Sequence, residues 1–107
     1  MRTLIRTLMT VATLMFVLGT LSFGADAGTD VFKTKCAMCH GADGKGETAM
    51  GKKFALKDLG SPDVQSLQDP VLNNLITNGK EKMPAYKEKL TADQIQDLVK
   101  YIRTFKK

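Results

Sequence analysis

The sequence contains few of the side chains from which active sites and metal sites are usually built. Its 107 residues include two cysteines, one histidine and no tryptophan. A zinc site needs four ligands, typically from two cysteine pairs, and the chain has no second cluster of such residues. Basic residues outnumber acidic ones by 16 to 11, but they are scattered without an interleaved aromatic platform. The charge therefore does not indicate nucleic-acid binding.

Strand patterns and repeats are also missing. No segment alternates apolar and polar residues over the length of a strand, which predicts an all-α class. The apolar stripes of the expected helices are short and the middle of the chain is rich in glycine, so we do not expect a large core of side chains alone. A domain of this size is marginally stable without a staple. A large, flat, apolar cofactor would fill the gap.

The first 27 residues have the pattern of an export signal. Arg2 and Arg6 precede an apolar run over residues 8–23, and Ala25-Asp26-Ala27 matches the small-x-small pattern that signal peptidase recognises. The run is shorter than the roughly 20 apolar residues needed to cross a membrane, which argues against the alternative of an uncleaved anchor. We expect a signal peptide at residues 1–27, cleaved after Ala27, and one exported domain at residues 28–107.

The clearest helix signals lie in the second half of the chain. Thr91 and Gln94 match a capping box, and the apolar residues that follow recur at helical spacing, which predicts a helix over 92–105. Asp69 as N-cap, with Pro70 at the first helical position and Asn78-Gly79 as a stop, predicts another. We also expect a first helix from about Thr29 into Cys36, a short helix from Ser61 to about Leu67, and mostly loop between Gly41 and Gly60.

One short motif, Cys36-Ala37-Met38-Cys39-His40, holds both cysteines and the only histidine. A disulfide within it would close a very small loop, and such loops stabilise a fold least. A thioredoxin-like redox pair is expected inside a βαβ pattern, which is absent. The remaining interpretation is a c-type haem, in which each thiol adds to a vinyl group and the adjacent imidazole binds the iron. The motif predicts one haem c, attached through Cys36 and Cys39, with His40 as an axial ligand.

A closed haem site needs a second axial ligand, and the absence of another histidine leaves the methionines. Met38 lies inside the attachment loop on the side of His40. Met83 precedes Pro84, which stiffens the chain, and thioether with imidazole is a known pair of haem ligands. We predict Met83 as the ligand, with Met50 in the glycine-rich loop as the alternative. Core packing is the other common use of a methionine.

These segments resemble the small monohaem class I cytochromes c of bacteria over residues 28–107. The resemblance rests on Cys36–Gly41, the GADGKG run, KMPAY at residues 82–86 and the terminal IQDLVKYIRTF. It implies the cytochrome c fold, with three to five short helices around one haem and with crossing terminal helices. The crossing residues would be Gly28, Phe32, Leu98 and Tyr101. It also implies thioether bonds at Cys36 and Cys39, with His40 as proximal and Met83 as distal ligand.

The sequence departs from this family at one point. Family members commonly have a proline about a dozen residues past the histidine, and its carbonyl accepts the imidazole N–H. Here the region reads AMGKKFAL and has no proline. The hydrogen-bond acceptor that would orient His40 is therefore unassigned.

With both axial positions filled, the iron would have no open site for oxygen or peroxide, so we expect a soluble periplasmic electron carrier and not an enzyme. We expect a monomer that meets redox proteins with acidic docking surfaces, without nucleic acid and without stable membrane insertion. Two alternatives stay open: a haem enzyme or ligand sensor with a labile sixth position, and an electron-accepting subunit of a periplasmic dehydrogenase. The lysines that flank the ligand segments are Lys33, Lys35, Lys52, Lys53, Lys80, Lys82, Lys87 and Lys89.

Overall fold

The computed structural model describes residues 24–107, and side chains from Ala27 onward. Most of the predicted signal peptide lies outside the described residues, and the cleavage point stays a prediction. The described chain contains α2 (Gly24–Val31), a π-helix (Phe32–Cys36), α3 (Ala37–His40), α4 (Ala49–Lys53), α5 (Pro62–Gln65), α6 (Asp69–Asn78) and α7 (Ala92–Arg103). Apart from one isolated bridge between Lys80 and Met83, no strand pairing occurs in this part of the chain. The predicted all-α class is confirmed.

The last helix begins as the sequence predicts. The Thr91 hydroxyl accepts a hydrogen bond from the backbone N–H of Gln94 (3.1 Å), and the Gln94 side chain accepts one from the backbone N–H of Thr91 (2.8 Å), which completes the capping box. α7 ends at Arg103, two residues before the predicted end, and the chain continues as a turn.

The predicted cap of α6 is wrong. Gln68 is the N-cap, and Asp69 and Pro70 lie in the first helical turn. Asp69 does not cap the helix because its carboxylate accepts hydrogen bonds from Arg103 of α7, from Nε at 3.0 Å and from Nη2 at 2.8 Å. The predicted stop at Asn78-Gly79 is confirmed.

Three other boundaries differ from the prediction. The first helix begins at Gly24 and continues through the π-helical turn as far as His40. α5 ends at Gln65 instead of about Leu67. The glycine-rich region between residues 41 and 60 is mostly loop, as expected, but it contains α4, which Thr48 caps by accepting a hydrogen bond from the N–H of Gly51.

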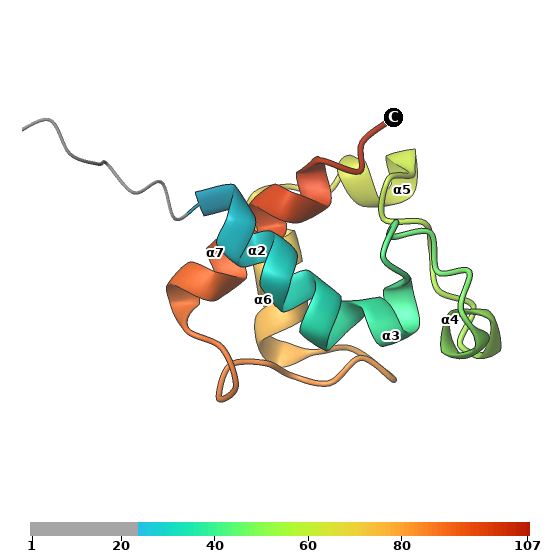
Figure 1. Cartoon of the computed structure of the whole chain (residues 1–107), viewed down its shortest axis with the longest axis horizontal. Helices are drawn as coiled ribbons and strands as arrows, with labels where there is room; N and C mark the ends of the chain where they lie inside the picture. Colours follow the sequence, from blue (N-terminus) through green and yellow to red (C-terminus); the bar gives the residue numbers. More distant parts are fainter. Residues whose placement is uncertain (1–23) are drawn as a thin grey trace, which may run out of the picture.

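α2 and α7 cross in close contact, as the sequence predicts (Figure 1). A Cβ atom added to Gly28 would lie 2.9 Å from the carbonyl carbon of Asp97 and 3.3 Å from Cβ of Tyr101, so the two backbones meet at this glycine. Below it, the rings of Phe32, Tyr101 and Phe105 pack with centroids 5.1 to 5.3 Å apart, a favourable aromatic spacing. The crossing joins the two ends of the described chain.

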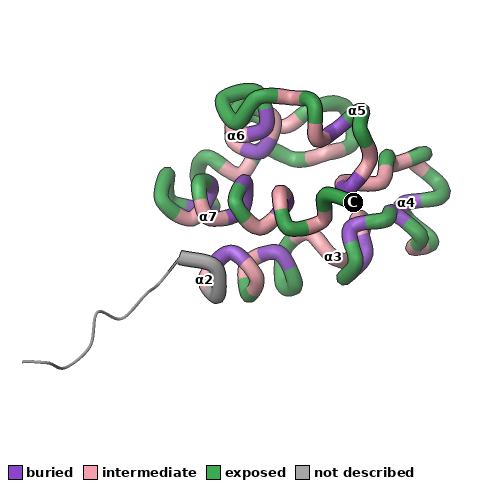
Figure 2. Tube along the Cα trace, turned by 90° about the horizontal axis from the view of Figure 1, so that it is seen from above, coloured by how far each residue is buried: buried purple, intermediate pink, exposed green. Residues whose placement is uncertain are grey.

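Among the residues that the structure describes, the apolar core has nine buried members, and α7 contributes four of them. Figure 2 shows buried positions along α2, α6 and α7. The buried residues are Phe32, Val64, Leu72, Ile76, Leu90, Ile95, Leu98, Val99 and Ile102. Six of these nine also line a cavity, so the core is incomplete on one side. None of the described helices has the length and hydropathy to cross a membrane.

Polar side chains hold the segment from Leu59 to Asp69 against α7. Gln65 Nε2 donates to the carbonyls of Leu59 (2.7 Å) and Ile102 (3.0 Å). Arg103 donates to the carbonyls of Gln65 (3.1 Å) and Leu67 as well as to Asp69. This clamp positions Leu59, Val64 and Leu67, which form one wall of the cavity.

Candidate functional site

Two adjoining cavities are lined by the four residues predicted to hold the haem. The larger, of about 270 Å³, is lined mainly by apolar side chains and reaches Cys36, His40 and Met83. The smaller, of about 60 Å³, is lined by the same three residues together with Cys39, Phe54 and Tyr86, among others. The structure therefore brings Cys36, Cys39, His40 and Met83 to one place, although more than 40 residues separate His40 from Met83.

The cysteine motif lies on two short helical turns. Cys36 ends the π-helix, a form that often occurs at functional sites, and Cys39 and His40 lie on α3. α3 ends at Gly41, whose φ of +81° disfavours any other residue. The N–H of Gly41 donates to the carbonyl of Ala37 (2.8 Å), which closes the turn.

Met83 reaches the cavity from a loop between α6 and α7. Hydrogen bonds in both directions join Lys80 and Met83 (3.1 and 2.9 Å) and tighten the loop. Gly79, with φ of +72°, allows the loop backbone to lie close to it. An added Cβ would lie 2.6 Å from the Met83 carbonyl oxygen and 2.8 Å from the Ala85 nitrogen. The Tyr86 backbone N–H donates to the carbonyl of Ile76 (3.1 Å), which attaches the loop to α6.

Tyr86 also connects the two ligand segments. Its hydroxyl donates to the carbonyl of Lys35 (3.2 Å), the residue before Cys36. Burial raises the pKa of Tyr86, and the nearby thiols Cys36 and Cys39 raise it further. Sequence reasoning included Tyr86 in the KMPAY motif but gave it no role, because its partner lies 51 residues away.

Burial also determines the protonation of the motif itself. It raises the pKa of the Cys36 thiol to about 11, with a further contribution from Cys39, and both cysteines are free of disulfides. Burial lowers the pKa of His40, so its imidazole is neutral near pH 7. Neutral imidazole is the form that binds a metal.

The site fits a large apolar cofactor that brings its own metal. Among residues 24–107, no three His, Cys, Asp or Glu side chains are grouped so that they could hold a metal ion. His40 Nδ1 is buried without a hydrogen-bond partner. Apart from His40, the walls of the larger cavity are apolar except for Lys57, Asp63 and Lys80. A covalently attached porphyrin needs apolar walls and an imidazole next to the cysteines that bind it.

The other two methionines downstream of residue 27 lie differently from Met83. Met38 is 79% exposed, and Met50, the alternative ligand, is on α4 and 37% exposed. Neither lines the two cavities. Met83 is partly buried and packs against the apolar core.

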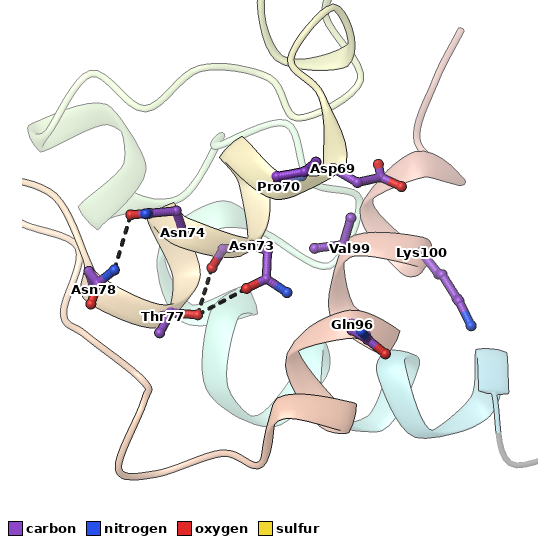
Figure 3. A pocket seen from close by; sticks show the side chains of 9 residues that line it. All are labelled: Asp69, Pro70, Asn73, Asn74, Thr77, Asn78, Gln96, Val99 and Lys100. Carbon is purple, nitrogen blue, oxygen red and sulfur yellow. Dashed lines mark hydrogen bonds between the residues drawn. The ribbon is translucent and has the colours of Figure 1, made fainter.

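A hollow larger than these two cavities lies elsewhere, between α6 and α7, with a volume of about 600 Å³ (Figure 3). It is open and polar, and contains none of the four predicted site residues. Two of its side chains bond within α6: Thr77 donates to the carbonyl of Asn73 (2.7 Å), and Asn78 donates to the Asn74 side chain (3.1 Å). We do not assign the cofactor to this hollow because it offers no ligand for it.

The known proteins that this chain resembles are c-type cytochromes, as the cysteine motif indicates. The family model described as cytochrome c oxidase, cbb3-type, subunit III matches residues 24–102. A cytochrome c6-like protein of Nostoc sp. is 34% identical over 95 residues, covering 84% of this chain and 83% of the relative. The cytochrome c subunit of a quinone alcohol dehydrogenase from Gluconacetobacter polyoxogenes is 34% identical over 88 residues, which are 72% of this chain and 18% of that subunit.

The fold also matches that of a c-type cytochrome. The solved structure of the KustC0563 c-type cytochrome matches with a TM-score of 0.70 and 30% identity, covering 75% of this chain and 98% of that one. The motif, the incomplete core, the family model and the structural neighbour all indicate one covalently attached haem c and electron transfer. The chain therefore belongs to the cytochrome c family, as a small monohaem class I cytochrome c.

Proposed function

We propose that the protein is a soluble electron carrier of the periplasm, with its haem attached at Cys36 and Cys39 and ligated by His40 and Met83. One observation carries this proposal: His40 and Met83, from separate segments, line the same apolar cavity beside the cysteines. Bound there, the haem supplies a one-electron Fe(III)/Fe(II) couple.

The cysteines anchor the cofactor. Cys36 and Cys39 would hold the haem through thioether bonds, each made by adding the S–H across a vinyl group without a leaving group. Two covalent bonds at the end of the first helical segment then tie the cofactor to α2 and, through the crossing, to α7.

The axial ligands limit the chemistry to electron transfer. His40 offers a neutral nitrogen because burial lowers its pKa. Met83 offers a thioether, a soft ligand that favours Fe(II) and raises the reduction potential. The apolar walls keep water away, which acts in the same direction. If His40 and Met83 both bind the iron, oxygen and peroxide would have no open site, and we propose no enzymatic activity.

Lysines near the cavity support docking on an acidic redox partner. Lys35 and Lys82 line the smaller cavity, Lys80 lines the larger one, and all three are exposed. Such charges steer association, so the rate of electron transfer with the natural partner should fall as ionic strength rises. A rate that does not depend on salt would contradict this docking mode.

A second candidate is a dedicated electron-accepting partner of one dehydrogenase. The similarity to the cytochrome c subunit of a quinone alcohol dehydrogenase favours it. The match with the cytochrome c6-like relative covers 84% of this chain and 83% of that protein, which favours a separate carrier. Affinity purification of the holoprotein from its periplasm distinguishes them: a stoichiometric dehydrogenase supports the subunit, and a monomer without a partner supports the carrier.

Two matched variants test the ligation. Met83→Ala removes the proposed distal ligand, and Met50→Ala removes the alternative from α4. We expect Met83→Ala to lower the reduction potential and to let the ferrous protein bind carbon monoxide, whereas the wild type and Met50→Ala do not bind it. Carbon monoxide binding by the wild type would favour a ligand sensor or enzyme. Unchanged spectra in Met83→Ala would contradict His/Met ligation.

A further inference from the structure

The imidazole of His40 lacks the hydrogen bond that usually orients a metal-binding histidine. Such a ligand normally donates its second ring N–H to a carboxylate, a carbonyl or water, which fixes the ring. Nδ1 of His40 is buried and has no hydrogen-bond partner. The ring orientation must therefore come from the backbone that carries it, at the end of α3.

That backbone is held by the segment that follows it. The N–H of Gly46 donates to the His40 carbonyl (2.7 Å), and the Thr48 hydroxyl donates to the Cys39 carbonyl (2.6 Å). These carbonyls lie at the C-terminal end of α3, where a helix leaves its last carbonyls without partners. Both acceptors belong to the residues of the attachment motif itself.

Thr48 connects this turn to α4. Its hydroxyl donates to Cys39 and also accepts from the N–H of Gly51 (2.9 Å), so one oxygen bridges the end of α3 and the start of α4. Thr48 is part-buried, which limits competition from water. A hydroxyl can do both, because it has one donor and two acceptor lone pairs.

Gly51 makes the contact between the two helices tight. It is buried, and an added Cβ would lie 2.7 Å from the Cys39 carbonyl oxygen and closer still to that of Gly46. Both obstacles are backbone atoms, so no side-chain rotation relieves the clash. α4 thus packs directly on the backbone of the attachment motif.

The geometry points to Thr48 as the positioning residue of His40: its hydroxyl, with α4 packed behind it at Gly51, holds the Cys39–His40 backbone and so sets the orientation of the imidazole on the iron. The inference rests on the proposed function, since it needs His40 as an axial ligand. In family members a proline carbonyl commonly orients the imidazole by accepting its N–H. Here no acceptor among the described residues replaces that carbonyl, and the hydrogen bonds hold the backbone of His40 instead of its ring.

The test compares variants of the exported holoprotein. Thr48→Val keeps the shape and removes the hydroxyl, and Thr48→Ser restores it. Thr48→Asp can still cap Gly51 but cannot donate to Cys39, which separates the capping role from the anchoring role. Thr104→Val is the matched control, because the Thr104 hydroxyl also donates to a backbone carbonyl, that of Tyr101, and Thr104 is exposed at the C-cap of α7.

The readouts are the proton NMR shifts of the haem methyl groups in the ferric protein, which depend on the orientation of the axial imidazole plane, and the reduction potential. We expect Thr48→Val to change the pattern of methyl shifts and to lower the potential as water gains access. Thr48→Ser and Thr104→Val should keep the wild-type pattern, and Thr48→Asp should show the changed pattern while it stays folded.

Two results would overturn the inference in different ways. Wild-type shifts and potential in Thr48→Val, or wild-type shifts in a folded Thr48→Asp, would reduce Thr48 to a cap of α4. If Thr48→Val fails to fold, the Thr48→Asp spectrum decides alone. A wild-type holoprotein whose iron lacks a histidine ligand would contradict the proposed function first, and the positioning role with it.

Discussion

Arg103 provides the sharpest test of how the cavity wall is held. Its guanidinium donates to the backbone carbonyls of Gln65 and Leu67 and to the carboxylate of Asp69, across a gap of more than 30 residues in sequence. The side chain is 29% exposed, whereas that of Asp69 is 70% exposed. The two carbonyl contacts are therefore better protected from water than the ion pair.

The carbonyl contacts should therefore contribute more to the free energy of unfolding than the ion pair. Hydrogen bonds contribute about 0.5–1.5 kcal/mol each, and more when one partner is charged, whereas exposed ion pairs contribute at most about 1 kcal/mol. We expect Arg103→Ala to lower the free energy of unfolding by about 2–3 kcal/mol and Asp69→Asn by less than about 1 kcal/mol. Arg103→Lys should lie between them, at about 1–2 kcal/mol, because an ammonium cannot reproduce the planar fork.

Urea unfolding of the oxidised holoprotein, followed by circular dichroism, measures these differences. A loss of 1 kcal/mol lowers the melting temperature of a domain this small by about 4–8 °C, so Arg103→Ala is readily detected. Lys100→Ala, an exposed position on the same helix, is the control and should stay within about 0.5 kcal/mol. The argument that the carbonyl contacts dominate would be refuted if Asp69→Asn and Arg103→Ala lost equal free energy of unfolding. It would also be refuted if Arg103→Lys were as stable as the wild type.

Three further predictions concern other parts of the fold. Gly79→Ala should displace the Met83 loop, because of the positive φ and the close carbonyl, and should lower the reduction potential; an unchanged potential would show that the loop has room. Thr91→Ala should destabilise the protein by about 0.5–2 kcal/mol through loss of the capping box, and a neutral result in urea unfolding would contradict the cap. Hydrogen bonds from Lys107 and from the Gly60 N–H hold the pKa of Asp58 below its ordinary value, so its contribution to stability is present above about pH 4 and is lost as the pH falls through the lowered pKa. Asp58→Asn should therefore have a lower urea midpoint than the wild type at pH 7, and the difference should shrink in acid; a difference that grows in acid would contradict this sign.

Local signals predicted the parts of the fold that local interactions determine. The capping box of α7 and the glycine stop of α6 depend on residues within one helical turn, and both are confirmed. The cap of α6 was wrong because the carboxylate of Asp69 bonds to Arg103, which is distant in sequence. No local pattern shows such a partner.

The helix α4 was missed for a related reason. Thr48 is a good N-cap, and two lysines follow at the helix end, but five residues are too few for a periodic signal. Its contact with the attachment motif depends on Gly51, a residue that sequence reasoning read only as part of a flexible loop.

The sequence also predicted the cofactor. The spacing of Cys36, Cys39 and His40 specified the cofactor, since no other chemistry fits so few groups. The choice of Met83 over Met50 rested on one neighbouring proline, whereas the structure adds burial and position at the cavity. Tyr86 and Thr48 had no assigned role, because each acts through a backbone carbonyl that the sequence does not reveal.

The central claim is that a haem bonded to both cysteines completes the core. Intact mass spectrometry of the protein purified from a periplasm with haem-attachment machinery, after treatment with a thiol-alkylating reagent under denaturing conditions, tests it most directly. We predict the mass of the processed chain plus one haem, without alkylation of Cys36 or Cys39. A colourless, folded protein with both cysteines alkylated would contradict the account.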